Sequence, residues 1–293
     1  MEFPASFIRA SEDYADFDKV VPAPFLRKSF TLTKPVADAE LIITGLGFYR
    51  VFLNGIELTK CILAPYISNP DDLVYFDRYS IARHLCEGEN VIGILLGNGM
   101  QNYFGGFPWG FDQASWRGAP MTALRITVRY SDGTKLTVES DETFRTHESP
   151  LWFNDLRCGE CYDARKEIDG WNLPGFDDSD WSNALMALPP RGEYRFCTAA
   201  PIVLGEARTP VSISPYRDGY LYDFGVNAAG ICRLKIAGMP GQTVRMFHGE
   251  WFHDGILEEQ NLHCRDDAKE IQSQIGRAVQ QECRDRSRMP SSA

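Results

Sequence analysis

The sequence predicts an all-β protein whose main body is a jelly-roll-like β-sandwich, followed by a second set of strands. Short apolar runs are separated by turn signals at intervals of roughly 8–12 residues, which is typical of a sandwich or jelly roll. Strong helical periodicity is absent before residue 265, so an alternating α/β fold is disfavoured. With 25 Gly, 17 Pro and 12% aromatic residues, the composition suits a turn-rich protein with large buried rings.

Length and charge narrow the function classes. A chain of 293 residues has room for about two domains of roughly 100–200 residues each. Its formal charge of −10, without a basic block, repels phosphate backbones, so we expect no nucleic-acid partner. No apolar run approaches the roughly 20 residues of a membrane span, so we expect no membrane partner. Residues 1–6 lack a basic stretch followed by an apolar one, and we therefore expect no signal peptide and a cytoplasmic location.

The first elements follow in order from residue 1. Residues 1–24 are polar and interrupted by proline, and we expect an N-terminal arm there. Apolar residues gather at 25–32 and 41–44, which predicts the first two strands. The Asn54-Gly55 pair lies between two apolar runs and predicts a hairpin, because both turn positions need a positive φ. One turn of helix is expected within residues 80–85.

Two further hairpins are expected. Apolar and polar residues alternate from 124 to 130 and resume at 136–138, with a turn at Asp132-Gly133. A third hairpin is expected between residues 231–236 and 244–247, with a turn at Pro240-Gly241. The proline-rich stretch at 188–192 reads as a linker that closes the first domain, so we place that domain at 25–200 and the next from 201.

The cysteines give no sign of a disulfide framework or a metal site. Five of the eight lie among apolar residues, and we interpret them as small buried hydrophobes: Cys61, Cys86, Cys197, Cys232 and Cys264. Cys158 and Cys161 have the C-x-x-C spacing, but no second ligand pair follows for zinc. No βαβ unit surrounds them, so a thioredoxin-like redox role is also disfavoured. We expect no metal ligands among the cysteines.

Two groups of residues are candidates for binding a sugar. Trp109, Trp116 and Arg117 belong to a Gly-rich aromatic loop, and exposed flat rings beside polar groups are what sugar faces stack on. The alternative is a long loop that packs its own rings over the sandwich. Hard oxygen donors gather at Asn154, Asp155 and Glu160, which suit a sugar contact or a calcium ion.

Four stretches, taken in order over residues 25–263, resemble the N-terminal, non-catalytic part of bacterial α-L-rhamnosidases. The first stretch is Leu46-Gly47-Phe48-Tyr49 with Leu53-Asn54-Gly55, Leu63-Ala64-Pro65 and Tyr75-Phe76-Asp77, and the second is Glu87-Gly88-Glu89-Asn90-Val91-Ile92-Gly93 with Leu96-Gly97-Asn98-Gly99. The third is Gly159-Glu160-Cys161-Tyr162-Asp163-Ala164-Arg165 with Gly170-Trp171 and Pro174-Gly175-Phe176-Asp177-Asp178-Ser179. The fourth is Tyr222-Asp223-Phe224-Gly225-Val226-Asn227 with Gly249-Glu250 and Asn261-Leu262. The chain departs from the family pattern at Met100 and Gln101, where relatives carry a Trp and an aromatic residue, and at Cys161.

The resemblance implies an enzyme that hydrolyses terminal α-L-rhamnose from glycosides or plant polysaccharides with inversion. Such a reaction needs an acid and a base carboxyl roughly 6.5–9.5 Å apart. In the family both come from an (α/α) toroid further along the chain, so we expect no catalytic residue here. By the same resemblance, residues 201–274 begin a second, concanavalin-like β-sandwich that is incomplete. The expected partner is a rhamnose-containing glycoside or polysaccharide; no cofactor is expected, with calcium at Asp155 and Glu160 left open.

Residues 275–293 differ from the rest of the chain. They carry Arg277, Arg284, Arg286 and Arg288 within an acidic protein, and they resemble one reading frame of a common sequencing-adapter oligonucleotide. We expect an artefactual or disordered tail; a basic nucleic-acid arm is the alternative. Two other readings of the whole chain stay open: a free-standing carbohydrate-binding module, and an ancillary β domain of another glycosidase such as a β-galactosidase.

Overall fold

The computed structural model describes residues 1–293 except 1–2, 4, 17–18, 104–109, 111–112, 157–158, 236, 239–240, 259–290 and 293. Strands dominate the described part, and its helical residues are confined to short 3-10 turns, among them η1 (Ala82–His84) and η3 (Ala164–Lys166). The all-β prediction is therefore confirmed, and no (α/α) toroid is found among the described residues. None of the described helical elements has the length and apolar character to cross a membrane.

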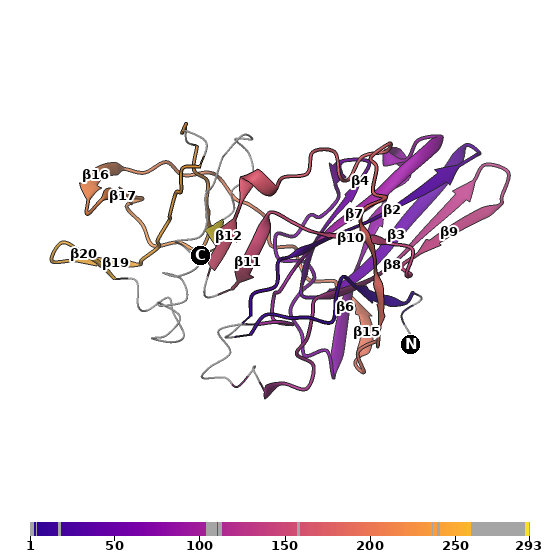
Figure 1. The fold of residues 1–293 in the computed structure, drawn as a ribbon, viewed down its shortest axis with the longest axis horizontal. Coiled ribbons are helices and arrows are strands. Elements are labelled where there is room, and N and C mark those ends of the chain that lie inside the picture. Colours follow the sequence, from indigo (N-terminus) through magenta and orange to yellow (C-terminus); the bar gives the residue numbers. More distant parts are fainter. Residues whose placement is uncertain are drawn as a thin grey trace.

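Two sheets packed face to face form the main body, drawn in indigo to magenta in Figure 1. The seven-stranded sheet has the order β14-β1-β8-β3-β6-β15, with β9 on β8, and the six-stranded sheet has the order β13-β10-β2-β7-β4-β5. The first contains β1 (Phe7–Arg9), β3 (Val36–Leu46), β6 (Leu73–Ser80), β8 (Met121–Tyr130), β9 (Lys135–Glu139), β14 (Leu185–Ala187) and β15 (Glu193–Phe196). The second contains β2 (Pro24–Leu32), β4 (Phe48–Leu53), β5 (Ile56–Glu57), β7 (Gly88–Gly97), β10 (Arg145–Glu148) and β13 (Ser182–Asn183).

The core between the sheets follows from the two-residue period of the strands. In β8, Leu124, Ile126 and Val128 are fully buried, and in β7 Ile92 and Ile94 face them with no exposed surface. Each such aliphatic side chain contributes about 1.5–3 kcal/mol when it leaves water. The long antiparallel pairings of β3 with β8 and of β2 with β7 hold these apolar rows in register.

Two of the expected hairpins and the helical turn are confirmed. Asn54 and Gly55, with φ of 50° and 81°, connect β4 to β5. Asp132 and Gly133 connect β8 to β9, and Gly133 has a φ of 83°. The short helix within residues 80–85 is η1. The turn residues therefore determine these connections locally, because asparagine and glycine tolerate the left-handed region.

The N-terminal arm is more than the polar leader that its composition suggests. Its residues Phe7–Arg9 form β1, which lies between β14 and β8 in the seven-stranded sheet. Phe3 and Phe7 are buried and pack beside Tyr194 of β15, with ring centroids 5.5 Å and 6.2 Å from the Tyr194 ring. Side chains of the arm and of β15 thus form a small second core on the outer face of this sheet, which the polar average of residues 1–24 conceals.

A long segment after β12 (Gly159–Tyr162) covers the outer face of the six-stranded sheet. Trp171 stacks on Phe25 of β2 with ring centroids 4.0 Å apart and planes inclined by 21°. Beside them the Arg27 side chain, only 1% exposed, forms an ion pair with Asp178. The glycine- and tryptophan-rich motif at residues 170–181 therefore packs against this face of the sandwich and covers it.

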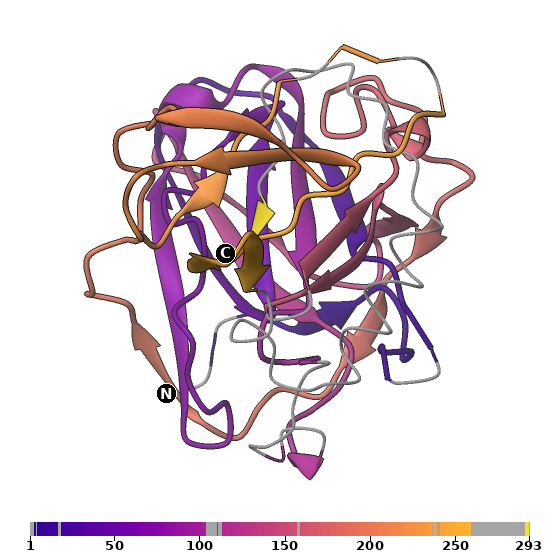
Figure 2. The same ribbon diagram turned by 90° about the vertical axis from the view of Figure 1, so that its left-hand side faces the viewer.

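The region from residue 201 is an open array of short hairpins at the left of Figure 1, and Figure 2 shows its orange strands in front of the sandwich. Its strands pair only in twos. They are β16 (Ser212–Tyr216), β17 (Gly219–Asp223), β18 (Ile231–Cys232), β19 (Trp251–His253), β20 (Ile256–Glu258) and β21 (Ser291–Ser292). None of its described residues up to 258 is buried, which agrees with the incomplete second sandwich that the sequence predicts.

The third expected hairpin is wrong in the described residues. β18 covers only Ile231 and Cys232 and pairs with β21, while residues 244–247 form no strand. The alternation in this segment has no opposing layer to bury it, so the local pattern alone does not hold a hairpin together. The expected turn position Pro240 lies outside the described residues.

The interpretation of the scattered cysteines as buried is also wrong. Cys86 is exposed, and Cys61, Cys197 and Cys232 are half-buried; Cys264 lies outside the described residues. These cysteines stand in loops or at strand ends, where side chains are only partly covered, and Cys61 packs against the edge of the main core.

Candidate functional site

Buried side-chain amides gather at one end of the sandwich, where β7 meets a separate hairpin. That hairpin pairs β11 (Leu151–Asp155) with β12 (Gly159–Tyr162). Asn98 follows β7 directly, and its backbone N–H donates to Asn154 Oδ1 at 2.6 Å. Its own Nδ2 donates to the Asn154 carbonyl at 2.8 Å. Together with Gln101 and Asn102 these residues form what we term the amide cluster, all of them less than a tenth exposed.

The side-chain nitrogen of Asn154 in the amide cluster has no partner in the described part of the chain. Asn154 Nδ2 is buried and makes no hydrogen bond, whereas Asn154 Oδ1 is engaged by Asn98. A buried donor left unsatisfied costs about 1–3 kcal/mol, so native structures rarely retain one without a role. The free atom is a donor, and it therefore suits an acceptor such as a hydroxyl oxygen rather than a cation.

Asn102 joins the cluster to the N-terminal arm. In its favoured orientation the Asn102 amide pairs with both backbone groups of Ala15, accepting from the N–H and donating to the carbonyl, each at 2.8 Å. The opposite orientation makes a single bond of 3.3 Å from Asn102 Nδ2 to Asn98 Oδ1. Two short bonds outweigh one long bond, so the pairing with Ala15 is preferred.

Arg117, a candidate from the sequence, is placed beside this contact. Its Nη2 donates to the Ala15 carbonyl at 3.0 Å, and its Cζ lies 5.1 Å from the centroid of the Tyr14 ring. The guanidinium group is therefore engaged by the arm. Its buried Nε has no hydrogen-bond partner.

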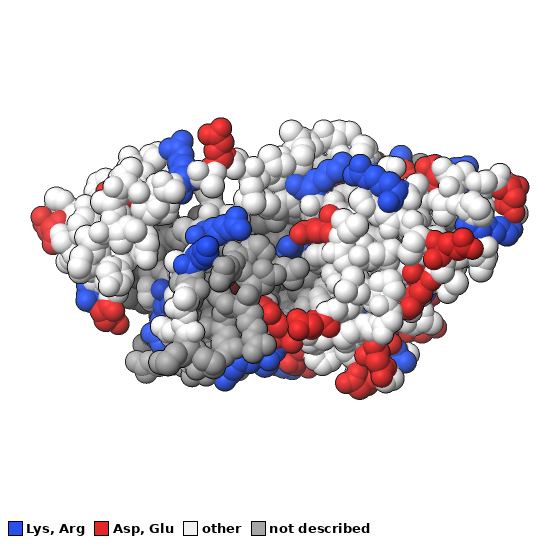
Figure 3. Space-filling model, turned by 90° about the horizontal axis from the view of Figure 1, so that it is seen from above, with Lys and Arg blue, Asp and Glu red and all other residues white. Residues whose placement is uncertain are grey.

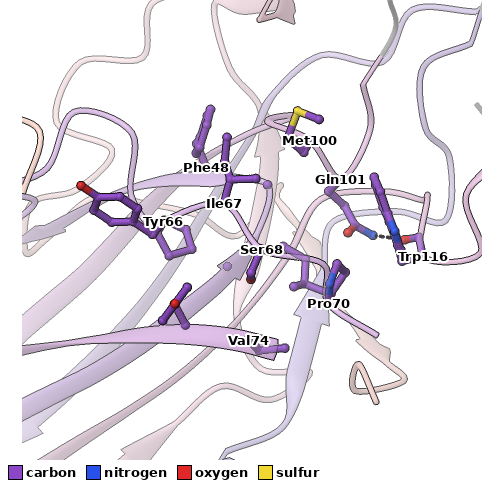
Figure 4. A pocket seen from close by; sticks show the side chains of 14 residues that line it. Phe48, Tyr66, Ile67, Ser68, Pro70, Val74, Met100, Gln101 and Trp116 are labelled. Carbon is purple, nitrogen blue, oxygen red and sulfur yellow. Dashed lines mark hydrogen bonds between the residues drawn. The ribbon is translucent and has the colours of Figure 1, made fainter. Parts of the chain in front are cut away.

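Trp116, the next candidate, is half-buried and reaches the cluster through its backbone. Gln101 Nε2 donates to the Trp116 carbonyl at 2.7 Å, as the dashed line in Figure 4 shows. The Trp116 side chain lines a pocket of about 40 Å³ together with Phe48, Ile67 and Met100. That volume accommodates a few water molecules, whereas a pocket for a small organic ligand has roughly 300–1,000 Å³. This pocket is too small for a sugar ring.

Asp155 and Glu160 are not brought together. Asn154 lies opposite Glu160 and Asp155 opposite Gly159 in the β11–β12 hairpin, so the two carboxylates extend from opposite faces. Asp155 is buried, and Glu160 is solvent-exposed. Although the Glu160 side chain is exposed, nearby protein atoms partly desolvate its carboxyl and raise its pKa, and the positive charge of Arg50 opposes that shift. No group of three His, Cys, Asp or Glu side chains in the described part of the chain has the arrangement of a metal site.

The remaining candidates are Trp109, the C-x-x-C pair and the motif that contains Asp163. Trp109 lies outside the described residues, as does Cys158 of the C-x-x-C pair. Burial raises the pKa of the Cys161 thiol to about 12, which disfavours the reactive thiolate. Asp163 caps η3 by accepting from the Arg165 backbone N–H, and the Arg165 guanidinium holds the pKa of that carboxyl below its usual range.

The structure therefore joins Asn154, Trp116 and Arg117 through residues that the sequence did not single out as site residues. These are Asn98, Gln101, Asn102 and Ala15. The Gly97-Asn98-Gly99 stretch reads as an ordinary turn, and nothing in the sequence connects it to Ala15, which lies more than 80 positions earlier.

Comparison with known proteins assigns the chain to a family. Residues 34–206 match the family described as Alpha-L-rhamnosidase N-terminal domain. The chain belongs to this family. Residues 215–284 match a second description, Bacterial alpha-L-rhamnosidase concanavalin-like domain. The expected rhamnosidase resemblance is confirmed for both parts of the chain, and the matched portion is the non-catalytic one.

Individual rhamnosidases support the same assignment. An alpha-L-rhamnosidase of Formosa agariphila is 34% identical over 233 residues, which is 78% of this chain and 24% of that protein. The structure of the alpha-L-rhamnosidase from Dictyoglumus thermophilum is 32% identical, with a TM-score of 0.67 over 75% of this chain and 25% of that one. The Streptomyces avermitilis alpha-L-rhamnosidase, complexed with L-rhamnose, is 28% identical with a TM-score of 0.74 over 80% and 23%. The chain spans about a quarter of the length of these relatives.

Proposed function

We propose that this chain is the ancillary N-terminal part of an enzyme that hydrolyses terminal α-L-rhamnose from glycosides or plant polysaccharides. The observation that carries the proposal is the succession of two rhamnosidase domains, in order, along a chain about a quarter as long as its relatives. The role of this part is to support the fold and position the substrate, and the acid and base carboxyls come from the toroid of the complete enzyme.

The carboxylates described here fit an ancillary role. Inverting hydrolysis needs a protonated acid and a separate base roughly 6.5–9.5 Å away. The two carboxyls with raised pKa values are Glu160, whose nearest charged influence is Arg50, and Asp77, which accepts a hydrogen bond from Tyr49. Asp77 is half-buried and bound to Tyr49 within the sandwich, which supports a structural role for this carboxyl.

The test begins at the gene. The genomic locus is sequenced across the codon for Gln274, and the complete reading frame is expressed and assayed with an aryl α-L-rhamnoside. We expect the frame to continue beyond Gln274 and its product to release rhamnose, whereas residues 1–293 alone release none. A frame that ends soon after Leu262 favours a free-standing carbohydrate-binding module, and a complete product that releases a different sugar favours another glycosidase.

Within this role we propose that the amide cluster binds a sugar. The unpaired Asn154 Nδ2 supports this proposal, because a hydroxyl oxygen would satisfy it. We propose that calcium, if it binds, uses amide oxygens beside this donor rather than the pair Asp155 and Glu160. With Asn102 paired to Ala15, Asn98 Oδ1 and the Asn102 oxygen lie 3.3 Å apart, and calcium accepts amide oxygens.

Binding is measured by calorimetry with L-rhamnose, with and without calcium, on the full chain. Asn154→Asp keeps an oxygen for the Asn98 N–H and removes the free donor, so we expect sugar binding to be lost while the hairpin remains. Asn183→Asp, at an exposed position of β13, is the matched control and binds as the parent does. Equal binding by parent and Asn154→Asp would exclude the amide cluster as the site.

A further inference from the structure

We infer that Arg117 is a positioning residue, which holds residues 14–16 of the N-terminal arm as a strap against the amide cluster and thereby keeps the site competent to bind. The inference rests on the proposed sugar-binding role of this cluster. It assigns Arg117 a task different from the direct sugar contact that the sequence suggests.

The strap is packed into the protein at Ala15 and does not simply lie next to the amide cluster. Ala15 is only 1% exposed, although the Tyr14 side chain before it is 38% exposed. Ala15 packs in a small apolar cluster with Phe153 of β11, the residue directly before Asn154. A short arm segment is thus buried against the strand that carries the unpaired donor.

Arg117 connects the strap to the loop that carries the cluster. Its guanidinium donates to the Ala15 carbonyl and lies over the Tyr14 ring, so it holds two successive arm residues. At the other end the loop is secured to the cluster, because the Gly118 N–H donates to the Gln101 carbonyl at 3.1 Å. An arginine at this position bridges two segments about 100 positions apart in sequence.

The strap determines which way the Asn102 amide points. While Ala15 is in place, Asn102 pairs with its N–H and carbonyl, and Asn98 Oδ1 receives no donor from Asn102. When Ala15 leaves, the two 2.8 Å bonds are lost, and Asn102 gains by turning its Nδ2 toward Asn98 Oδ1 at 3.3 Å. Docking of the strap therefore keeps Asn98 Oδ1 available beside Asn154, and its release occupies that oxygen.

Binding and docking are then thermodynamically linked. Consider a ligand that binds the amide cluster when Asn98 Oδ1 is available. If docking of the strap raises the affinity for this ligand by some factor, the bound ligand raises the docking equilibrium of the strap by the same factor. This reciprocity distinguishes a positioning role from a purely structural one, because a structural anchor would be indifferent to the sugar.

The experiment combines hydrogen exchange with binding on the full chain. Backbone exchange of the peptide containing Ala15 is followed by mass spectrometry for the parent, Arg117→Ala and Arg117→Lys, with and without L-rhamnose. Arg129→Ala, which removes an exposed arginine of β8, is the matched control. L-rhamnose affinity is measured by calorimetry for the same four proteins.

We expect Arg117→Ala to speed exchange at Ala15 and to weaken L-rhamnose binding, each by about tenfold, within the usual range of coupling between sites. Arg117→Lys restores part of both effects because it keeps a donor for the Ala15 carbonyl. L-rhamnose slows exchange of this peptide in the parent, and Arg129→Ala matches the parent throughout.

Three results would overturn the inference. Exchange at Ala15 that is unchanged in Arg117→Ala shows that Arg117 does not hold the strap. Faster exchange with unaltered L-rhamnose affinity shows an anchor without a positioning role, while the sugar-binding proposal survives. If the parent binds no L-rhamnose, the sugar-binding proposal fails and the positioning role fails with it, and the exchange data then describe only a structural contact.

Discussion

The Tyr49 hydroxyl of β4 donates to the Asp77 carboxylate of β6 at 2.5 Å and thereby connects the two sheets of the sandwich. The Tyr49 oxygen also lies 3.2 Å from the Tyr79 hydroxyl, within the same apolar surroundings. Burial raises the pKa of Asp77, and the hydrogen bond from Tyr49 opposes that rise. The hydrogen bond from Tyr49 therefore helps the half-buried Asp77 carboxyl to stay ionised.

Replacing this tyrosine should destabilise the protein in a pH-dependent way. Tyr49→Phe removes the donor, and we expect a loss of about 1–3 kcal/mol in the free energy of unfolding at pH 7. Because the folded pKa of Asp77 is raised, its folded-state penalty is present above that pKa and disappears as pH falls toward the unfolded value of about 3.9. The loss should be smaller near that lower pH.

Urea unfolding of the parent and Tyr49→Phe at both pH values measures the difference. The control is Tyr220→Phe, since Tyr220 is 67% exposed in the second region and should leave the unfolding curve unchanged. A loss of equal size at both pH values would show that Asp77 ionisation does not contribute.

The buried ion pair between Arg27 and Asp178, beside the Trp171 ring, should make the stability of the fold sensitive to a single substitution. Asp178→Ala leaves the Arg27 guanidinium buried without its carboxylate, which typically costs about 3–5 kcal/mol. Asp180→Ala, at an exposed neighbouring position, is the matched control. Thermal unfolding of both variants checks this, and equal midpoints would show that the pair does not stabilise the fold.

The packing of Trp171 and Asn172 against the six-stranded sheet leaves no room for a side chain at Gly93 of β7. A methyl group built there would lie 2.8 Å from the Trp171 ring and 2.9 Å from Asn172. We expect Gly93→Ala to displace the ring and to destabilise the fold by about 1–3 kcal/mol. Tryptophan emission should shift to longer wavelength as the ring becomes wetter. Gly205→Ala, where nothing lies within 4 Å, should change neither property.

We predict that the full chain self-associates through residues 201–258. Large apolar side chains are more than a third exposed there: Ile202, Val203, Leu204, Val211, Ile213, Tyr220, Tyr222, Phe224, Val226, Ile231, Phe247, Trp251, Phe252 and Ile256. The left-hand part of the surface in Figure 3, formed by this region, is mostly uncharged, whereas both signs of charge are interspersed over the sandwich. Unpaired strand edges beside such a surface favour aggregation.

Size-exclusion chromatography at increasing concentration measures this association. We expect the full chain to form larger species, and a chain ending at residue 200 to remain monomeric over the same range. A monodisperse full chain that melts cooperatively would contradict the interpretation of residues 201–258 as an unfinished sandwich.

Local signals in the sequence predicted most of the sandwich. Alternation determined β8, and the Asn54-Gly55 and Asp132-Gly133 turns determined their hairpins, because strand period and positive φ act over a few residues. The same signals failed at residues 231–247, where the described part of the chain supplies no second layer to bury the apolar side chains. A pattern holds a strand only when something covers its apolar face.

The candidate site was partly visible in the sequence. Asn154, Trp116 and Arg117 were recognised by residue type, since amides, aromatic rings and guanidinium groups are common in sugar sites. Their partners were not, because the contacts of Asn98 with Asn154 and of Ala15 with Asn102 join positions 56 and 87 residues apart. Hydrogen bonds over such distances leave no periodic trace in the chain.

The sequence by itself determined the all-β class, the main hairpins and the rhamnosidase resemblance, since these depend on local periodicity, turn residues and ordered motifs. Only the tertiary structure decided that the arm contributes β1, that Arg27 is buried against Asp178, and that Arg117 holds Ala15. Each of these depends on which distant segments pack together, and packing depends on the shape and burial of the whole sandwich rather than on any short stretch of residues.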